Sequence, residues 1–283
     1  MVVITGATGQ LGRLVIASLL RKVPASDIVA TVRNVDKAKD LAALGVQVRH
    51  ADYTLPATWD DALKGADKLL LISSSEIGQR VSQHRTVIEA AQRAGIKLLL
   101  YTSVLHADTS PLGLAGEHRE TEQIIRASGL PHVLLRNGWY TENYTAGVPA
   151  ALEHGAVCGC AGNGRIASAA RKDYAEAAAV ALTTDNHAGR TYELAGDHAY
   201  TLGDLAAEIS RQSGRNINYV NMAEPEYKQL LVSAGLPEPI AALLSDSDTG
   251  ASHGALFDDS HQLSILIGRA TTPMATSVAE ALR

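Results

Sequence analysis

The sequence predicts an α/β protein in which a doubly wound parallel sheet is followed by a smaller, mainly helical C-terminal domain. Short apolar runs alternate with stretches of helical period through the first half of the chain. Several of these runs are apolar on both faces, as parallel strands covered by helices must be. After about residue 140 the alternation breaks into short elements punctuated by glycine and proline. Five or six alternations of strand and helix are typical of a doubly wound sheet.

Six strands are expected in the first half, each a short apolar run. They are 2–4, 28–32, 46–48, 69–72, 98–101 and 133–135. Between them, apolar residues recur at helical spacing, as in Leu11, Leu14 and Val15. Gly45 and Gly95 follow helices expected from about 36 and about 79. A glycine at this position commonly ends a helix.

The second half is expected to be mainly helical. Its predicted helices are about 173–182, 202–213, 224–234, 237–246 and 274–282, with strands at 191–194 and near 217–220. We therefore expect a sheet domain at 1–140 with returning segments at about 155–200. A smaller domain is expected from about 141–154 and 200–283.

Composition excludes several classes of function. The 283 residues are 46% apolar and only 4% aromatic, and the net charge is −5. Scarce aromatics and the absence of a basic block argue against nucleic-acid binding and against an anionic membrane surface. Cys158 and Cys160 lack the further cysteines that a zinc site needs, so we expect two buried thiols and no metal. The apolar run from Val2 has no basic segment before it, which favours a cytoplasmic protein over a secreted one.

A glycine-rich turn directly follows the first strand and opens the first helix. Gly6 permits a tight turn, Gly9 lets the backbone approach a pyrophosphate, and Gly12 lets the helix pack close to the sheet. The helix N-terminus then offers unpaired N–H groups to phosphates. In this strand–turn–helix context the spacing predicts a dinucleotide-binding domain of the Rossmann type at residues 1–140.

The end of the second strand indicates which dinucleotide is bound. An acidic residue there would hold the ribose hydroxyls of NAD, whereas this chain has Arg33, whose donors suit the 2′-phosphate of NADP(H). The alternative for Arg33 is a solvated surface arginine. After the third strand, Asp52 is either an acceptor for the adenine amino group or the cap of a turn.

Two further polar segments are expected at the same edge of the sheet. Ser73, Ser74 and Ser75 follow the fourth strand, where hydroxyls suit the cofactor ribose, although a plain polar turn is the alternative. Residues 136–142 follow the sixth strand, near the expected nicotinamide end.

The chain resembles a known family in several segments. Residues 3–12 resemble the opening of the NmrA-like group of atypical short-chain dehydrogenases. Residues 70–76, 105–114, 135–140, 251–252 and 256–259 are similar to the bacterial NAD(P)H:quinone oxidoreductases of type 2. The resemblance runs over nearly the whole chain, and the later segments are far more specific than the glycine turn.

The resemblance implies a Rossmann-like domain that holds NADPH, a small C-terminal domain, and a quinone as the hydride acceptor. The cofactor-binding residues that it implies are Gly6, Ala7, Thr8, Gly9, Gln10, Leu11, Arg33, Ser73, Ser74, Ser75, Asn137, Gly138, Trp139, Tyr140, Thr141, Glu142 and Ser168.

The chain lacks the proton relay of the short-chain dehydrogenases that act on alcohols. Those enzymes use Tyr-x-x-x-Lys on the helix after the fifth strand, where this chain has Leu114 and His118. A quinone does not need the relay, because its conjugated carbonyls accept a hydride readily and solvent can protonate the product. His118 is a candidate proton donor, but a surface position on the helix is the stronger expectation.

No residue is assigned a catalytic role. Asn137 and Tyr140 are the candidates for substrate contact, with Trp139 and Phe257 beside them. An aromatic ring offers stacking to a quinone, and an amide can donate to developing oxyanion charge. Core packing is an equal alternative for Trp139 and Tyr140.

The sequence leaves three functions open. The first is direct hydride transfer from NADPH to a quinone, which makes the protein an enzyme of the NAD(P)H:quinone oxidoreductase kind. The second is an NmrA-type redox sensor that holds a dinucleotide without turnover. The third is reduction of another conjugated acceptor, such as a triphenylmethane dye. The sequence allows a homodimer, although no heptad or apolar stripe specifies one.

Overall fold

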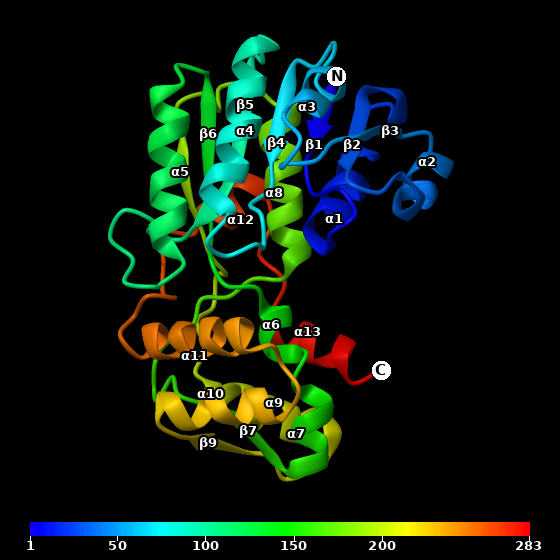
Figure 1. Ribbon diagram of the computed structural model, residues 1–283. Coiled ribbons are helices and arrows are strands. Elements are labelled where there is room, and N and C mark those ends of the chain that lie inside the picture. Colours follow the sequence, from blue (N-terminus) through cyan, green and yellow to red (C-terminus); the bar gives the residue numbers. More distant parts are fainter. The chain divides into compact units, whose positions relative to one another are not determined.

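The computed structural model describes all residues from Met1 to Arg283 and divides the chain into two compact units (Figure 1). We call Met1–Ala107, Gly116–Asn137 and Lys172–Tyr192 the sheet unit. We call Asp108–Ala115, Gly138–Arg171 and Glu193–Arg283 the helical unit. No helix in either unit is both long and apolar enough to span a membrane.

The large sheet, most of which belongs to the sheet unit, is built on parallel strands whose order makes it doubly wound. The strands are β1 (Val2–Ile4), β2 (Ile28–Val32), β3 (Gln47–His50), β4 (Lys68–Leu71), β5 (Leu98–Val104), β6 (His132–Asn137) and β8 (Thr191–Leu194). Their order in the sheet is β3-β2-β1-β4-β5-β6-β8. β1 pairs in parallel with both β2 and β4, so the direction of winding reverses between β1 and β4. In such sheets, ligands bind at this reversal, beyond the carboxyl ends of the strands.

Helices cover both faces of this sheet. They are α1 (Gln10–Leu19), α2 (Lys39–Ala43), α3 (Ala57–Ala62), α4 (Arg80–Arg93), α5 (Ala115–Ala127) and α8 (Arg171–Thr183). One core cluster joins α3, α4 and α5 to the strand residues on one face, with Val3, Leu69 and Leu99 fully buried. Alternate strand residues such as Ile4 and Leu70 point to the other face and are equally buried. Right-handed crossovers place α1 on that second face.

The predicted strands of the first half are confirmed, with small differences at their ends. β1 and β2 have the expected bounds, whereas β5 continues to Val104, three residues beyond the predicted end. The helix expected from about 36 begins as a 3₁₀ turn at Val35–Ala38 and becomes α2. Gly45 and Gly95 follow their helices with φ of +84° and +66°, the left-handed conformation that favours glycine.

The helical unit contains a small second sheet. Its helices are α6 (Thr141–Thr145), α7 (Val148–His154), α9 (Leu202–Ser213), α10 (Glu224–Ser233), α11 (Glu238–Ser252), α12 (Gln262–Ile267) and α13 (Met274–Ala281). β7 (Ala156–Gly159) pairs in parallel with β9 (Asn218–Asn221), and α9 packs on both strands. Thr201 and Asp204 form a reciprocal capping box at the start of α9. Within this unit α10 and α11 pack against each other (Figure 1).

Candidate cofactor-binding site

A cleft of about 520 Å³ opens in the sheet unit where the winding of the sheet reverses. Its walls come from the segments that follow β1, β2, β3 and β4. The lining residues are Gly6, Thr8, Gly9, Gln10, Leu11, Gly12, Thr31, Val32, Arg33, Asn34, Lys37, Ala51, Tyr53, Trp59, Ile72, Ser73, Ser74, Ser75 and Glu76. The cleft therefore brings together the predicted glycine turn, Arg33 and the three serines.

The glycine turn has the geometry of a phosphate cradle. Gly6 has φ +56°, and the Gly9 amide donates to the Gly6 carbonyl at 2.9 Å. A Cβ on Gly12 would lie 2.4 Å from the Gly6 oxygen and 2.8 Å from Cα of Ala7. Only glycine therefore lets α1 start this close to the turn. No side chain caps the N-terminus of α1, which leaves its first amides for an anion.

Charged side chains gather at the mouth of the cleft. Arg33 and Lys37 are the cations among the lining residues, and Glu76 is the single carboxylate. Arg33 donates from Nη1 to Oε1 of Glu76 at 3.1 Å, and the Arg33 side chain is 67% exposed. Arg33 thus stands at the cleft, as expected, but with an acidic partner that the sequence did not indicate.

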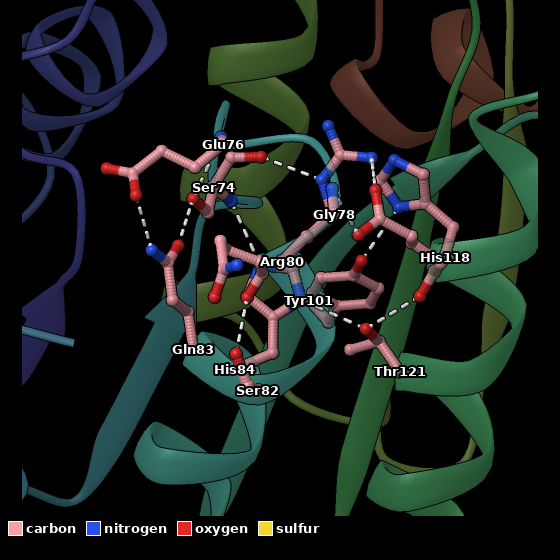
Figure 2. Close-up of polar contacts among 12 residues, drawn as sticks. Ser74, Glu76, Gly78, Arg80, Ser82, Gln83, His84, Tyr101, His118 and Thr121 are labelled. Atoms are coloured by element: carbon pink, nitrogen blue, oxygen red, sulfur yellow. Dashed lines mark hydrogen bonds and ion pairs between the residues drawn. The ribbon is translucent and has the colours of Figure 1, made fainter. Parts of the chain in front are cut away.

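The three serines differ in what they offer to a ligand. The Ser74 hydroxyl donates to Oε1 of Gln83 and accepts from the Glu76 amide at 3.2 Å, so it is engaged within the protein (Figure 2). The Ser73 amide donates to the hydroxyl of Thr102 at 2.9 Å. The hydroxyls of Ser73 and Ser75 make no hydrogen bond within the chain and are available to a ligand.

A buried polar network fixes the backbone of Ser74 through its amide and its carbonyl (Figure 2). The Ser74 amide donates to Nε2 of His84 at 2.9 Å, and Nε of Arg80 donates to the Ser74 carbonyl at 2.7 Å. Because Nε2 of His84 accepts, its proton is on Nδ1, which donates to Thr121 at 3.0 Å. Burial and the neighbouring Arg80 lower the pKa of His84 to about 3, so the ring is neutral.

The expectation that His118 lies on the surface is wrong. His118 is 4% exposed, and its Nδ1 lies 2.7 Å from the hydroxyl of Tyr101 on β5. Burial holds the pKa of His118 well below its usual value. His118 is not among the lining residues of the cleft. Its neutral ring joins α5 to β5 and is a poor proton donor at neutral pH.

The loop after β3 and helix α3 contribute aromatic rings that sequence reasoning missed. Tyr53 and Trp59 both line the cleft and stack with ring centroids 5.5 Å apart. Asp52, by contrast, accepts from the amide and hydroxyl of Thr54, both at 2.8 Å, and is absent from the lining. Asp52 is therefore a turn cap, the alternative reading of that residue. In a chain with 4% aromatics, two rings between the third strand and the end of the following helix were the available signal.

Asn137, at the end of β6, carries an unusual buried atom. Its side chain is 6% exposed, and its Oδ1 has no hydrogen-bond partner. An unsatisfied buried acceptor costs roughly 1–3 kcal/mol, so native folds usually pair such an atom with a hydrogen-bond donor. Asn137 is not among the lining residues of the cleft.

The remaining predicted residues lie together within the helical unit. Tyr140 forms a backbone bridge with Ala169, which brings the 138–142 segment beside Ser168. The hydroxyls of Thr141, Ser168 and Tyr200 form a buried chain, with oxygen–oxygen distances of 2.8 and 2.6 Å. Burial raises the pKa of Tyr200 to about 12. Sequence reasoning missed Tyr200, which lies far along the chain.

Two of these residues have contacts that fix the segment. Glu142 accepts the Arg171 amide at 2.9 and 3.0 Å, which caps the start of α8. The Arg171 guanidinium lies over the Tyr140 ring at 4.6 Å from its centroid. Trp139 is 8% exposed. Glu142 is thus engaged by the Arg171 amide, whereas Tyr140 is half-buried.

The residues present fit a dinucleotide. The cradle, the unpaired helix amides, the exposed guanidinium and the free serine hydroxyls match the parts of a dinucleotide phosphate in chemistry. No group of three or more His, Cys, Asp or Glu side chains is arranged to bind a metal ion.

Comparison with known proteins shows the family to which the chain belongs. The family model described as NAD(P)H-binding matches residues 6–185, and the chain belongs to that family. Among curated relatives, quinone oxidoreductase 2 of Escherichia coli K12 is 59% identical over 278 residues, covering 98% of this chain and 97% of that protein.

Solved structures agree with this family over the whole chain. The NADPH-dependent quinone oxidoreductase of Escherichia coli, solved with NADPH, has a TM-score of 0.98 at 58% identity, with all of both chains covered. The triphenylmethane reductase of Citrobacter, solved with NADP(H), has a TM-score of 0.96 at 40% identity, covering 99% of this chain and 100% of that one.

Proposed function

We propose that this protein is an NADPH-dependent quinone oxidoreductase. The observation that carries the proposal is identity of 59% to quinone oxidoreductase 2 across 98% of this chain. A second observation supports the proposal: the glycine turn and the two cations of the cleft suit a phosphorylated dinucleotide. When bound, NADPH supplies a hydride at the nicotinamide C4. The quinone accepts that hydride, and the resulting hydroquinone anion takes a proton from solvent.

In this proposal, the sheet unit binds and orients the cofactor. The turn from Gly6 to Leu11 and the first amides of α1 hold the pyrophosphate, because they offer unpaired N–H groups and the positive end of the helix dipole. Arg33 holds the 2′-phosphate, and the hydroxyls of Ser73 and Ser75 take the ribose end. Orientation by these groups is the main catalytic contribution, since the hydride chemistry belongs to the cofactor.

The absence of a protein proton relay suits this acceptor. His118 is the side chain at the position of the missing lysine, and it is neutral, buried against Tyr101 and outside the cleft lining. An alcohol dehydrogenase must move a proton to or from the substrate oxygen, whereas a quinone yields a delocalised anion that water can protonate. We propose that the nicotinamide and the quinone are contacted by the segment from Asn137 to Glu142 together with Ser168.

The experiment follows NADPH absorbance with purified protein and a panel of benzoquinone, naphthoquinone, a triphenylmethane dye and no acceptor. Quinone-dependent oxidation that is faster with NADPH than with NADH is the expected result. Tight NADPH binding without oxidation by any acceptor would contradict the proposal and leave a dinucleotide sensor as the better function.

Arg33→Ala tests the assigned cation. A charge-assisted hydrogen bond to phosphate is worth about 1.5–3 kcal/mol, so KM for NADPH should rise by roughly 10- to 100-fold while KM for NADH stays close to wild type. Arg21→Ala is the matched control, because Arg21 is an exposed cation near the end of α1 outside the cleft. Equal losses with both cofactors would show that Arg33 does not read the phosphate.

Reduction of another flat, electron-poor acceptor is the second candidate. The observation that favours it is 40% identity to the Citrobacter triphenylmethane reductase, with 99% of this chain covered. The dye arm of the panel decides between the two acceptors by their kcat/KM ratio.

We propose a cytoplasmic protein, which the lack of any membrane-spanning helix supports. We further propose a homodimer, which light scattering on the purified protein would test through the measured mass.

A further inference from the structure

An acidic side chain stands against the proposed phosphate-binding cation. Glu76, in the segment after β4, lies 3.1 Å from Arg33, which follows β2. Both line the cleft, and Glu76 is its single carboxylate. Most exposed ion pairs contribute little to stability. This one is notable for its place, because a carboxylate beside the guanidinium lowers the attraction of that guanidinium for a phosphate.

The carboxylate of Glu76 is held in this position by buried partners. Its Oε2 accepts from Nε2 of Gln83 at 2.7 Å, and Gln83 is 5% exposed (Figure 2). The Glu76 amide donates to Ser74 at 3.2 Å, and the Ser74 hydroxyl donates in turn to Gln83. Glu76 is therefore tied at both its backbone and its side chain, so it does not swing freely into solvent.

We propose that Glu76 is a specificity-determining residue that limits the preference of this cleft for NADPH over NADH. The proposal rests on the proposed function, since it assigns Arg33 to the 2′-phosphate. Glu76 neutralises Arg33 and repels a phosphate placed on it. The same carboxylate accepts a hydrogen bond from a ribose 2′-hydroxyl, the group that NADH has in place of the phosphate.

The geometry makes the free energy of binding differ between the two cofactors. Binding of NADPH requires Arg33 to exchange part of its interaction with Glu76 for the phosphate, and it places two anionic groups near each other. Binding of NADH leaves the ion pair intact. The ratio of the two affinities is then set by Glu76 together with Arg33, and not by Arg33 alone.

The test is calorimetric binding of NADPH and NADH to wild type and to Glu76→Gln, without any acceptor. The substitution removes the charge but keeps the length of the side chain. Exposed pairs are worth up to about 1 kcal/mol, and relief of repulsion adds to that, so the Kd for NADPH should fall by roughly 3- to 10-fold. The Kd for NADH should stay the same or rise.

Two further variants separate this effect from a general change of charge. Asp36→Asn removes one negative charge from the turn after β2, where Asp36 pairs with Lys39 at 2.8 Å outside the cleft lining, and should leave the Kd ratio unchanged. In an Arg33→Ala background, Glu76→Gln should have a smaller effect than in wild type, because the two residues act together.

The outcomes are distinct. A Kd ratio that Glu76→Gln leaves unchanged, or shifts toward NADH, overturns the role of Glu76 while the proposed function stands. Failure of wild type to bind either cofactor overturns the proposed function itself. A higher preference for NADPH in Glu76→Gln, absent in Asp36→Asn, supports the inference.

Discussion

At the scale of single residues, Gly12 is the position in the cleft with the least room for a side chain. A Cβ there would meet backbone atoms of Gly6 and Ala7 at 2.4 and 2.8 Å. Backbone does not move aside as a flexible side chain does, so Gly12→Ala should destabilise the fold by about 1–3 kcal/mol and weaken NADPH binding. Chemical denaturation and a binding titration check the two effects.

Gly116→Ala is the matched control for that variant. Gly116 is also near the start of a helix, α5, but a Cβ on it would meet no atom within 4 Å. Alanine has the higher helix propensity, so this variant should be as stable as wild type or more stable by up to about 1 kcal/mol. If both variants lost stability equally, the close approach of α1 to the turn would not explain the loss.

Single residues also show where sequence reasoning ends. The glycine turn and Arg33 could be predicted because their chemistry is local: a spacing in one turn and a charge at one strand end. Glu76 and Arg33 are 43 residues apart, and nothing in the chain between them indicates that they pair. The same holds for Ser168 and Tyr200, whose contact depends on a fold in which distant hydroxyls meet.

At the scale of elements, a buried ion pair ties α5 to the strands beneath it. Glu122 accepts from Arg136 on β6 at 2.9 and 2.8 Å and from Ser103 on β5 at 2.7 Å. Glu122 is 1% exposed and Arg136 is 5% exposed. Removing one charge of a buried ion pair typically costs about 3–5 kcal/mol.

Glu122→Gln should therefore lower the free energy of unfolding by roughly 3 kcal/mol or more, measured by urea denaturation. Glu120→Gln serves as its control, since Glu120 lies on the same helix and is exposed. Its effect should stay within about 0.5 kcal/mol, as for most surface changes. Equal stability of the two variants would mean that the buried pair does not hold α5 in place.

The same helix explains why the burial of His118 was not predicted. The buried face of α5 carries His118, Thr121, Glu122 and Ile125, which lie three and four residues apart. Three of these four side chains are polar, so the apolar periodicity that reveals a covered helix is hidden. Strands of continuous apolar sequence, such as β2, carry no such ambiguity and had the predicted bounds. β7 pairs with β9 across about 60 residues of chain, a separation that local pattern does not bridge.

At the scale of the whole molecule, one buried carboxyl makes stability depend on pH. Asp248 on α11 is 3% exposed and accepts from Tyr144 at 3.0 Å and from the Cys160 amide at 3.2 Å. Burial raises the pKa of Asp248 from 3.8 to about 6. Because the folded pKa lies above the unfolded one, its contribution to stability is full below pH 3.8 and is lost as pH rises through about 6.

The free energy of unfolding of wild type relative to Asp248→Asn should therefore fall by up to about 3 kcal/mol between pH 4 and pH 7. Taking this difference removes the opposite trend from Asp67 and Glu208, whose pKa values are lowered to about 2 by cationic partners and hydrogen bonds. Asp259→Asn, an exposed site on the same unit, should show a constant difference from wild type across this range. Denaturation curves at four or five pH values would reveal a flat Asp248→Asn difference if the carboxyl stays ionised throughout.

The stacked pair in the cleft makes the protein its own fluorescent probe. Trp59 is one of only two tryptophans in the chain, is 1% exposed, and lines the cleft beside Tyr53. Reduced nicotinamides absorb where tryptophan emits, so we expect the excitation energy of Trp59 to transfer to NADPH bound in the same cleft. Quenching of intrinsic emission would then report occupancy of the cleft in real time, without a label and without turnover, in wild type and in every variant that keeps Trp59.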